Sequence, residues 1–450
     1  MNFKLRLNSF AVTLRYTPAF VLLVILFSAA GCSSNSKPPT DQRNFKDDSN
    51  TISWNILFPA TTNLNTRLER ITKIKADITE FYNGYNKQNN TKYTVVFDRP
   101  RFCPCDSLLF NLNFLAIDGE GESLTRGQPQ PKPAGEGDLV SVNIPVTDNS
   151  KVTENSDNKP VNINKSKIDD SKILAIIDSG IDPELFPNDF ARLIWLDPSA
   201  LTLFNFIPGE NRYDMQDRTS VKHGTAVATI VYDAMKNYNK DKYSKLMILR
   251  ALDQNNEGSI FSISCALSYA NQKKATLINM SLGYYGAPDS ILLHYLKLTK
   301  EHSIEVFAAA GNTRDNHTVL QLCDTNPNGN FLGDTVFFYP ACFTRNLSNI
   351  TSVTQMNKVN TPCYYQNFSN KFISLGIYDT ANCCKFPVRF SGGTTFYEGS
   401  SFATPAASGL RMGTLLSPPG SLTDPWTDMM ENTSTNVTIG GKYISYPPNP

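Results

Sequence analysis

Three residues of the types that carry out nucleophilic catalysis stand in three separate segments of the chain. Asp178 follows a continuous apolar run, residues 173–177, and precedes a Ser-Gly pair that allows a tight turn. His223, one of four histidines, opens an apolar helical run, where the helix dipole helps to keep an imidazole neutral. Ser401 follows Gly-Ser and begins a stretch of small residues that reaches residue 416. Because a serine hydroxyl needs a base to take its proton, these types together suit acyl transfer.

Taken alone, each of these residues has an ordinary structural interpretation. Asp178 is then a turn aspartate, His223 a capping or surface histidine, and Ser401 a residue near a serine N-cap. In open α/β sheets, however, ligand sites form outside the carboxyl ends of the strands. An aspartate directly after a buried strand lies at that edge. The chemistry therefore depends on elements that bring the three segments together.

Strands and helices alternate in the part of the chain that contains these segments. This alternation predicts an α/β fold in which a parallel sheet carries helices on both faces, within a domain over residues 171–450. The apolar runs of the expected strands are residues 173–177, 246–249, 276–279 and 304–309, and the expected helices are residues 225–238, 262–272 and 291–302.

The three segments resemble the active-site signatures of the subtilisin family. They read Asp-Ser-Gly at 178–180, His-Gly-Thr with Val-Ala at 223–228, and Gly-Ser-Ser-x-Ala-x-Pro at 399–405. Their order, Asp then His then Ser, is that of subtilisin. Residues 245–253, 278–283 and 308–312 also resemble family segments, so the likeness covers about residues 172–422. The chain is identified as a subtilisin-like serine protease, which implies the subtilisin fold and a protein or peptide substrate.

The resemblance assigns a catalytic role to each matching residue. Ser401 would attack the scissile carbonyl, His223 would take its proton and pass it to the leaving amine, and Asp178 would orient His223. Asn312, with the backbone N–H of Ser401, would bind the developing oxyanion. This chemistry requires no cofactor. Relatives often bind calcium, but no acidic cluster in the sequence marks a metal site, and none is assigned.

The resemblance also implies how the substrate binds. Ser281, Leu282 and Gly283 would pair with the substrate backbone as an added antiparallel strand. Two residues depart from the family pattern: Thr229 and Tyr284 stand where glycine is frequent. Tyr284 directly follows the substrate-binding segment, so we expect it to narrow the substrate groove.

A small α+β domain is expected over residues 51–118. Strands at 52–58, 93–97 and 108–117 surround a helix whose apolar residues recur every three or four positions from Leu64 to Phe81, with Thr66 and Glu69 as a capping box. Two interpretations stay open: a prodomain removed on maturation, as many subtilisin-like enzymes have, or a permanent accessory domain. Residues 119–170 are polar and read as a linker, with a short strand at 139–144 and accessible sites for maturation cleavage.

The first 32 residues differ from the rest and predict export. A basic start precedes an apolar run, residues 19–30, which is too short for a comfortable membrane span. Ser-Ala-Ala-Gly-Cys at 28–32 resembles the lipobox of bacterial lipoproteins, which implies cleavage before Cys32 and lipidation of its thiol. The alternatives are an ordinary signal peptide and an uncleaved anchor. Residues 33–50 read as a tether, so we expect a membrane-anchored lipoprotein of the cell envelope.

Cysteine use agrees with an oxidising compartment. Without Cys32 eight cysteines remain, an even number that predicts disulfides; the metal interpretation is weaker because the spacing of 103–105 and 383–384 does not suit zinc. Five of the eight fall between Asn312 and Ser401, which we interpret as a disulfide-stapled insertion beside the active site. The five are Cys323, Cys342, Cys363, Cys383 and Cys384.

The charge balance bears on the partners. With 42 basic against 41 acidic residues, the chain lacks the basic excess of a nucleic-acid binder, and we expect a monomer. Two other hypotheses remain: a surface lipoprotein that binds through an inactive protease fold, and a maturation protease with one narrow substrate. The first is disfavoured because nucleophile, base, orienting acid and oxyanion asparagine are all present.

Overall fold

The computed structural model describes residues 50–446 with gaps, and all described elements belong to the unit Ser49–Pro450. The signal, tether and lipidation predictions, Cys32 included, therefore lie outside the described residues. No helix within the described part of the chain has the length and apolar character of a membrane span. The gaps are residues 121, 125–137, 144, 148–150, 156–167, 187–189, 239–241, 313–331, 333–335, 357–361, 364, 370, 380–384, 391–392, 418–429 and 432–441.

The N-terminal elements form an antiparallel sheet covered by one long helix. The helix α2 (Leu64–Asn89) buries Ile71, Ile74, Ile78 and Tyr82, which lie on one face because they are three or four positions apart. Its cap is Asn63, whose side chain accepts from Thr66 N, so the predicted capping box at Thr66 is wrong. The strand order is β2 (Thr94–Phe97), β4 (Leu109–Ile117), β1 (Ile52–Leu57) and β5 (Leu139–Val142), with β3 (Arg101–Phe102) also paired to β4.

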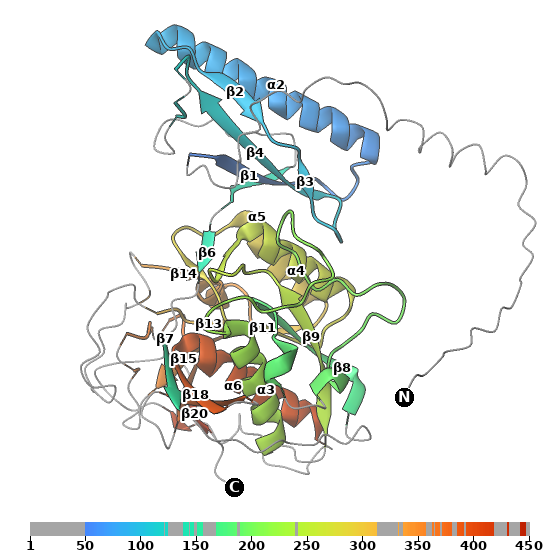
Figure 1. Ribbon diagram of the computed structural model, residues 1–450, viewed down its shortest axis with the longest axis vertical. Coiled ribbons are helices and arrows are strands. Elements are labelled where there is room, and N and C mark those ends of the chain that lie inside the picture. The colour runs from blue at the N-terminus through green and yellow to red at the C-terminus, as the bar shows by residue number, and fades with distance from the viewer. Residues whose placement is uncertain are drawn as a thin grey trace, which may run out of the picture. The chain divides into compact units, whose positions relative to one another are not determined.

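The main sheet confirms the predicted α/β fold (Figure 1). All of its strand pairs are parallel except the last, β19 with β20, which is antiparallel. A continuous apolar run such as residues 173–177 of β8 is expected where both faces of a parallel sheet are covered. The order is β9 (Tyr243–Arg250), β8 (Ile168–Asp178), β11 (Leu277–Met280), β13 (Glu305–Ala309), β15 (Ile350–Met356), β16 (Leu375–Asp379), β20 (Lys442–Tyr446) and β19 (Met430–Glu431).

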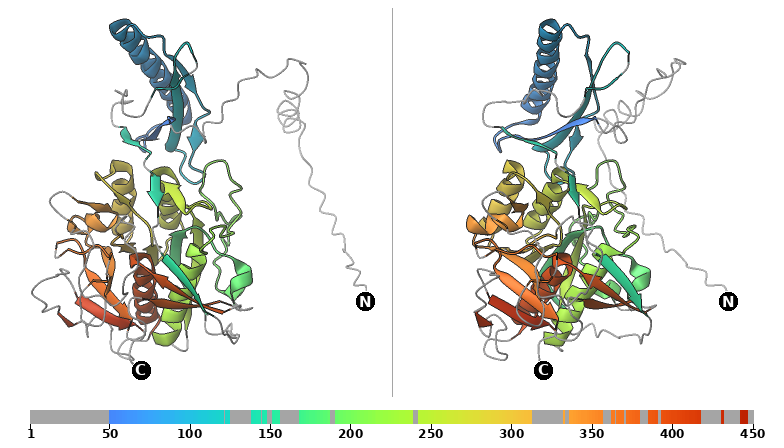
Figure 2. Two further views of the ribbon diagram at one scale, coloured as in Figure 1. Left: turned by 60° about the vertical axis from the view of Figure 1, so that its left-hand side comes forward. Right: turned by 90° about the vertical axis from the view of Figure 1, so that its left-hand side faces the viewer.

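Helices cover both faces of this sheet. Leu174 and Ile176 of β8 belong to the same buried cluster as residues of α3 (His223–Tyr238) and α6 (Ser400–Leu416). The alternate residues, Ala175 and Ile177, cluster with residues of α4 (Ile260–Gln272) and α5 (Ser290–Glu301). The helices α3 and α6 lie side by side in both views (Figure 2), and a Cβ at Gly409 would lie 2.6 Å from the Val231 carbonyl oxygen. The two faces therefore have separate cores, and α3 is held directly against α6.

The span from Asn312 to Ser401 is more than the insertion that we expected. It supplies β15 and β16 to the main sheet and the hairpin of β17 (Phe386–Phe390) and β18 (Gly393–Glu398). The strand β15 was missed because its sequence, ITSVTQM, mixes polar residues into a buried run. Ser352, Thr354 and Gln355 are nevertheless buried.

The predicted linker contributes short strands to neighbouring elements. Besides β5, the strand β6 (Pro145–Thr147) pairs with β10 (Glu257–Ser259), and β7 (Lys151–Asn155) pairs with β18. The strand β5 confirms the short strand predicted at residues 139–144. The strands β6 and β7 are three and five residues long, which leaves little sequence pattern to detect.

The cysteines need a correction. Cys103, Cys105, Cys265 and Cys342 are free thiols, so the prediction of disulfides is wrong for these four. Burial raises the pKa of the Cys265 thiol to about 11, which keeps it protonated and unreactive at neutral pH. Cys363 is disulfide-bonded. Cys323, Cys383 and Cys384 lie outside the described residues.

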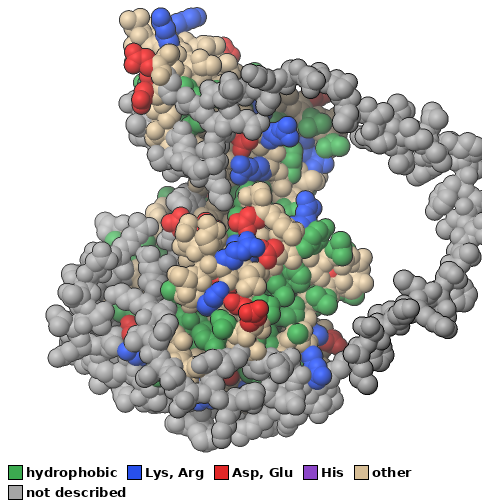
Figure 3. Space-filling model, in the orientation of Figure 1, with side chains coloured by type: hydrophobic (Ala, Val, Ile, Leu, Met, Phe, Trp, Pro, Cys, Tyr) green, Lys and Arg blue, Asp and Glu red, His purple; other side chains and the backbone are tan. Residues whose placement is uncertain are grey.

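The surface carries charges of both signs. On the face shown in Figure 3, basic and acidic side chains are interspersed with apolar ones. This mixture agrees with the near-zero net charge of the sequence.

Candidate active site

Asp178 and His223 form a buried pair at the carboxyl edge of the main sheet. Asp178 is the last residue of β8 and His223 the first of α3, and the two side chains are 1% and 0% exposed. The His223 Nδ1 and Asp178 Oδ1 atoms are 2.7 Å apart, and the same oxygen accepts from the Ser179 N–H at 2.8 Å. A carboxylate at this distance favours the tautomer with hydrogen on Nδ1, which makes Nε2 the basic nitrogen of the ring.

A second buried aspartate, Asp217, ties the two segments together. Its carboxylate accepts from the Ser179 hydroxyl at 3.1 Å, and from both the N–H and the hydroxyl of Thr219 and of Thr225 at 2.7–3.0 Å. The Thr219 hydroxyl oxygen in turn accepts from the His223 N–H at 3.0 Å. Asp217 thus links the turn after Asp178 to the first turn of α3, where a negative charge is also favoured by the helix dipole. Asp217 was not expected from the sequence, although an aspartate two residues before a threonine is a recognisable signal for a side chain that accepts from the backbone.

Ser401 lies in the first turn of α6 and is 3% exposed. The turn before it needs glycine, because Gly399 has φ +133° and an added Cβ would lie 3.1 Å from Asn312 Nδ2. The Gly399 N–H donates to the Gln355 side chain of β15 at 2.9 Å, which anchors this turn to the sheet. The ring of Phe402, the next residue, lies 5.1 Å from the imidazole of His223, so the start of α6 packs against the Asp178–His223 pair.

Asn312 is held against the residue that precedes Ser401. Its Oδ1 accepts from the Ser400 N–H at 3.0 Å and the Ser400 hydroxyl lies 3.3 Å away, while the Gly311 N–H donates to that hydroxyl at 2.9 Å. The Asn312 carbonyl oxygen accepts from the Tyr285 hydroxyl at 2.8 Å. Since Oδ1 is used as an acceptor, the Nδ2 group is the part of this amide that can donate to a substrate oxygen. Neither the contact of Ser400 with Asn312 nor that of Tyr285 was expected from the sequence.

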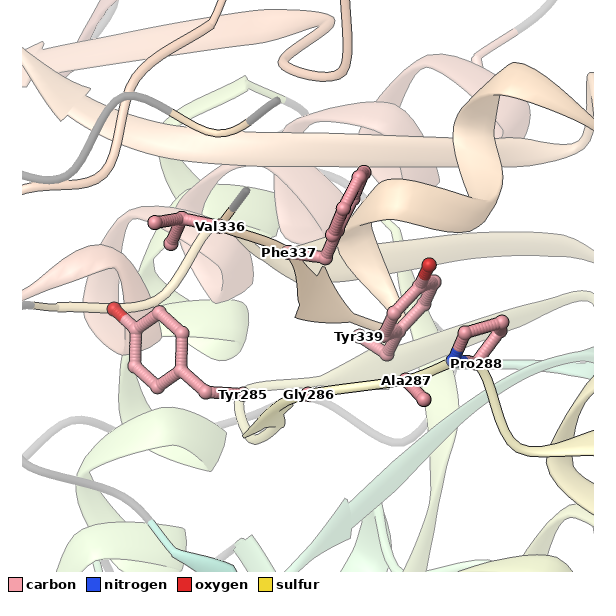
Figure 4. Close-up of a pocket in the computed structure, with 7 residues that line it drawn as sticks. All are labelled: Tyr285, Gly286, Ala287, Pro288, Val336, Phe337 and Tyr339. Atoms are coloured by element: carbon pink, nitrogen blue, oxygen red, sulfur yellow. The ribbon is translucent and has the colours of Figure 1, made fainter. Parts of the chain in front are cut away.

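The predicted substrate segment, Ser281 to Gly283, follows β11 at the same edge of the sheet. All three residues are buried, and the Ser281 hydroxyl accepts from Asn279 Nδ2 at 2.9 Å. The chain then enters β12 (Tyr284–Tyr285), which pairs with β14 (Phe338–Tyr339). An open pocket of about 650 Å³ lies beside these two strands, lined by Tyr285, Gly286, Ala287, Pro288, Val336, Phe337 and Tyr339 (Figure 4).

The two departures from the family pattern have structural roles. The Thr229 hydroxyl donates to the Thr225 carbonyl within α3 at 2.8 Å. The Tyr284 hydroxyl accepts from the N–H of Asp289, the N-cap residue of α5, at 3.0 Å. Burial, and then the nearby Asp289 carboxylate, raise the pKa of Tyr284, so the phenol stays neutral. Tyr284 therefore anchors α5, and the expectation that it narrows a groove finds no support in this contact.

Arg250 is a fully buried cation next to the site. It ends β9 beside Asp178 in the sheet register, and its Nη1 lies 2.5 Å from Glu210 Oε2 and 3.5 Å from Asp214 Oδ2. A buried guanidinium requires such pairing. In the described ranges, no three His, Cys, Asp or Glu side chains gather as ligands for a metal ion.

Comparison with known proteins finds similar chains among the subtilisin-like proteases. The chain is 30% identical over 162 residues to Subtilisin-like protease 3 of Plasmodium falciparum, covering 32% of this chain and 20% of that protein. It is 24% identical over 278 residues to the Thermophilic serine proteinase of Bacillus sp., covering 61% of this chain and 59% of that protein. The chain thus spans less than two thirds of either relative. A solved structure of a cold adapted subtilisin-like serine proteinase aligns with a TM-score of 0.44 at 17% identity, covering 65% of this chain and 93% of that one.

The family assignment rests on the match to a whole family rather than on any single relative. The sequence profile of the Subtilase family matches residues 169–418, more than half of the chain. The matched region begins in β8 and ends after α6, so it contains Asp178, His223, Asn312 and Ser401. The chain belongs to the subtilase family.

Proposed function

We propose that this protein is a serine endopeptidase that hydrolyses peptide bonds through an acyl-enzyme. The observation that carries the proposal is the buried Asp178–His223 pair, with a 2.7 Å contact, packed against the first turn of the helix that bears Ser401. An acid that orients a histidine beside a serine is the arrangement that activates a serine nucleophile. Membership in the subtilase family supports the same activity.

Each step follows from these side chains. Ser401 attacks the scissile carbonyl while His223 Nε2 takes the hydroxyl proton, and Asp178 stabilises the imidazolium that forms. The tetrahedral oxyanion receives hydrogen bonds from the Asn312 Nδ2 group and from the Ser401 N–H at the start of α6. His223 then gives its proton to the leaving amine, and a water molecule hydrolyses the acyl-enzyme with His223 again as the base.

The proposed substrate-binding region is the edge of the sheet beside Asp178, His223 and Ser401. The backbone of Ser281, Leu282 and Gly283 pairs with the substrate as an added antiparallel strand, which supplies affinity without selecting a sequence. No cofactor takes part in this mechanism, and the enzyme acts as a monomer.

We further propose that the enzyme is tethered at the cell envelope. A signal peptide over residues 1–32 directs export, lipid on Cys32 holds the chain at a membrane, and residues 33–50 act as the tether. A lipid anchor confines the peptidase to substrates at that surface. Incubation with radiolabelled palmitate tests this part: label should enter the wild type and not Cys32→Ser.

The central test compares wild type with Ser401→Ala. Wild type should digest casein and react with a fluorophosphonate probe, whereas Ser401→Ala should do neither. Ser417→Ala is the matched control, because Ser417 caps the far end of the same helix, and it should behave as wild type. Intact mass and N-terminal sequencing of the same samples decide whether residues 51–118 are removed as a prodomain or stay as an accessory domain. A folded wild type that neither digests casein nor reacts with the probe would contradict the proposal and favour a binding lipoprotein.

A further inference from the structure

One aromatic ring fills the space between two backbone segments of the proposed site. A Cβ added at Gly283 would lie 2.3 Å from Cε1 of Phe338, and one added at Gly311 would lie 2.8 Å from Cδ2 of the same ring. The Phe338 ring therefore lies between the substrate segment 281–283 and the segment 310–312, which leads to Asn312. Both glycines are needed there because any side chain would collide with the ring.

The ring is held in place from several directions. Phe338 belongs to β14, which pairs with β12, and its N–H donates to the Cys342 Sγ atom at 3.3 Å. Its ring meets the ring of Tyr285 edge-on at 4.9 Å between centroids. The Tyr285 hydroxyl is itself bonded to the Asn312 carbonyl oxygen. At 6% exposure, the Phe338 ring is part of the packed interior rather than a mobile surface group.

In the proposed binding mode, one residue of the substrate lies over this ring. If the substrate strand pairs with residues 281–283 and its scissile carbonyl meets Ser401 and Asn312, the residue before the cleaved bond spans the gap between the two segments. Its side chain projects into the gap, and the gap is occupied by Phe338. A packed interior accommodates extra atoms only by displacing neighbours, so large side chains are excluded.

We propose that Phe338 is the residue that sets the specificity of this peptidase, by limiting the residue before the cleaved bond to glycine, alanine or serine. The proposal rests on the proposed serine endopeptidase function and names its substrate class. Because a ring occupies the space that an aromatic substrate side chain needs, we expect alanine to be preferred over phenylalanine at this position by at least about 100-fold in kcat/KM.

The test uses the full-length protein and peptides that differ only at the residue before the cleaved bond, which is Gly, Ala, Leu or Phe. Phe338→Ala should raise kcat/KM for the Phe peptide by about 100-fold and leave the Ala peptide within a few-fold. Phe338→Leu, which keeps the core filled, should raise cleavage of the Leu peptide and provides a second variant if removing the whole ring prevents folding. The control is Phe337→Ala, because Phe337 faces the neighbouring pocket (Figure 4) and should leave the preference unchanged.

Fluorophosphonate labelling of each variant separates the two proposals. If wild type is labelled and prefers Ala, and the Phe338 variants accept larger residues, the assignment stands. If wild type is labelled but cleaves the Phe peptide as well as the Ala peptide, Phe338 does not set specificity, although the endopeptidase function stands. Labelled Phe338 variants with an unchanged preference overturn the assignment in the same way. A folded wild type without labelling or cleavage refutes the function and this inference with it.

Discussion

Asp217→Asn tests whether one buried carboxylate holds the proposed site together. The substitution keeps the size of the side chain and replaces one acceptor oxygen by an amide NH₂ group. Each carboxylate oxygen accepts from a backbone N–H. The Thr219 N–H donates to Oδ1 of Asp217, and the Thr225 N–H donates to Oδ2. A threonine hydroxyl can rotate to accept from the new NH₂ group, but a backbone N–H cannot. One of these N–H groups must then lose its partner.

The magnitude follows from the bonds that are lost. A hydrogen bond to a charged group contributes about 1.5–3 kcal/mol, and a buried N–H without a partner costs about 1–3 kcal/mol. These two values describe much the same loss, so they are not added. Removing the negative charge at the start of α3 costs about 0.3–1 kcal/mol more. We expect Asp217→Asn to lower the free energy of unfolding by about 2–4 kcal/mol.

The same change should slow the chemistry, because the first turn of α3 carries His223. A displacement of a catalytic group by about 1 Å can cost about 100-fold in rate, so we expect kcat/KM to fall by about 10- to 100-fold. Stability is measured by urea unfolding in a Ser401→Ala background, which prevents self-digestion. Activity is measured with Ser401 intact, as the rate of fluorophosphonate labelling.

Asp169→Asn is the matched control for this prediction. Asp169 accepts two hydrogen bonds, from the N–H and the hydroxyl of Ser171, at an exposed position. Asp169→Asn should lower the free energy of unfolding by less than about 1 kcal/mol, since water can replace the lost hydrogen bonds. If Asp217→Asn is no more destabilising than Asp169→Asn, or labels at the wild-type rate, the positioning role of Asp217 is wrong.

Three further predictions follow from single residues. Gly399→Ala should cost about 1–3 kcal/mol in backbone strain and slow labelling of the site, since its Cβ meets Asn312 at a φ of +133°; an unchanged labelling rate would contradict this. Arg250→Met should lower the free energy of unfolding in urea by about 3–5 kcal/mol, because it leaves two carboxylates without their buried cation. The Arg218 side chain is 52% exposed, so Arg218→Met should lower the free energy of unfolding by less than about 1 kcal/mol. Burial opposes ionisation of Asp197, but hydrogen bonds from a lysine and a serine outweigh it and lower its pKa to about 2. Since the unfolded pKa is about 3.9, this stabilisation is present above that pH and is lost as the pH falls toward 2. Urea midpoints of wild type should therefore fall more steeply over that range than those of Asp197→Asn, and parallel curves would refute the assignment.

Much of the sheet could be predicted because its strands and helices have strong local patterns. The run before Asp178 is apolar without interruption, and α5 was expected at residues 291–302 and found at Ser290–Glu301. The strand β15 was missed because burial of its polar residues depends on partners outside the strand. Ser352, for example, bonds to the Phe372 carbonyl oxygen, twenty positions along the chain.

The local sequence alone placed Asp178 after a buried strand and His223 and Ser401 at helix starts, because periodicity and turn residues mark the ends of elements. Only the tertiary structure decided which residues surround them. Asp217 contacts Ser179, Asn312 contacts Ser400, and the Phe338 ring lies against Gly283 and Gly311, because the order of strands brings distant segments to one edge of the sheet. The expectation about Tyr284 rested on local information alone, its position beside the substrate segment. The ring that enters the gap comes instead from β14, more than fifty residues further along the chain.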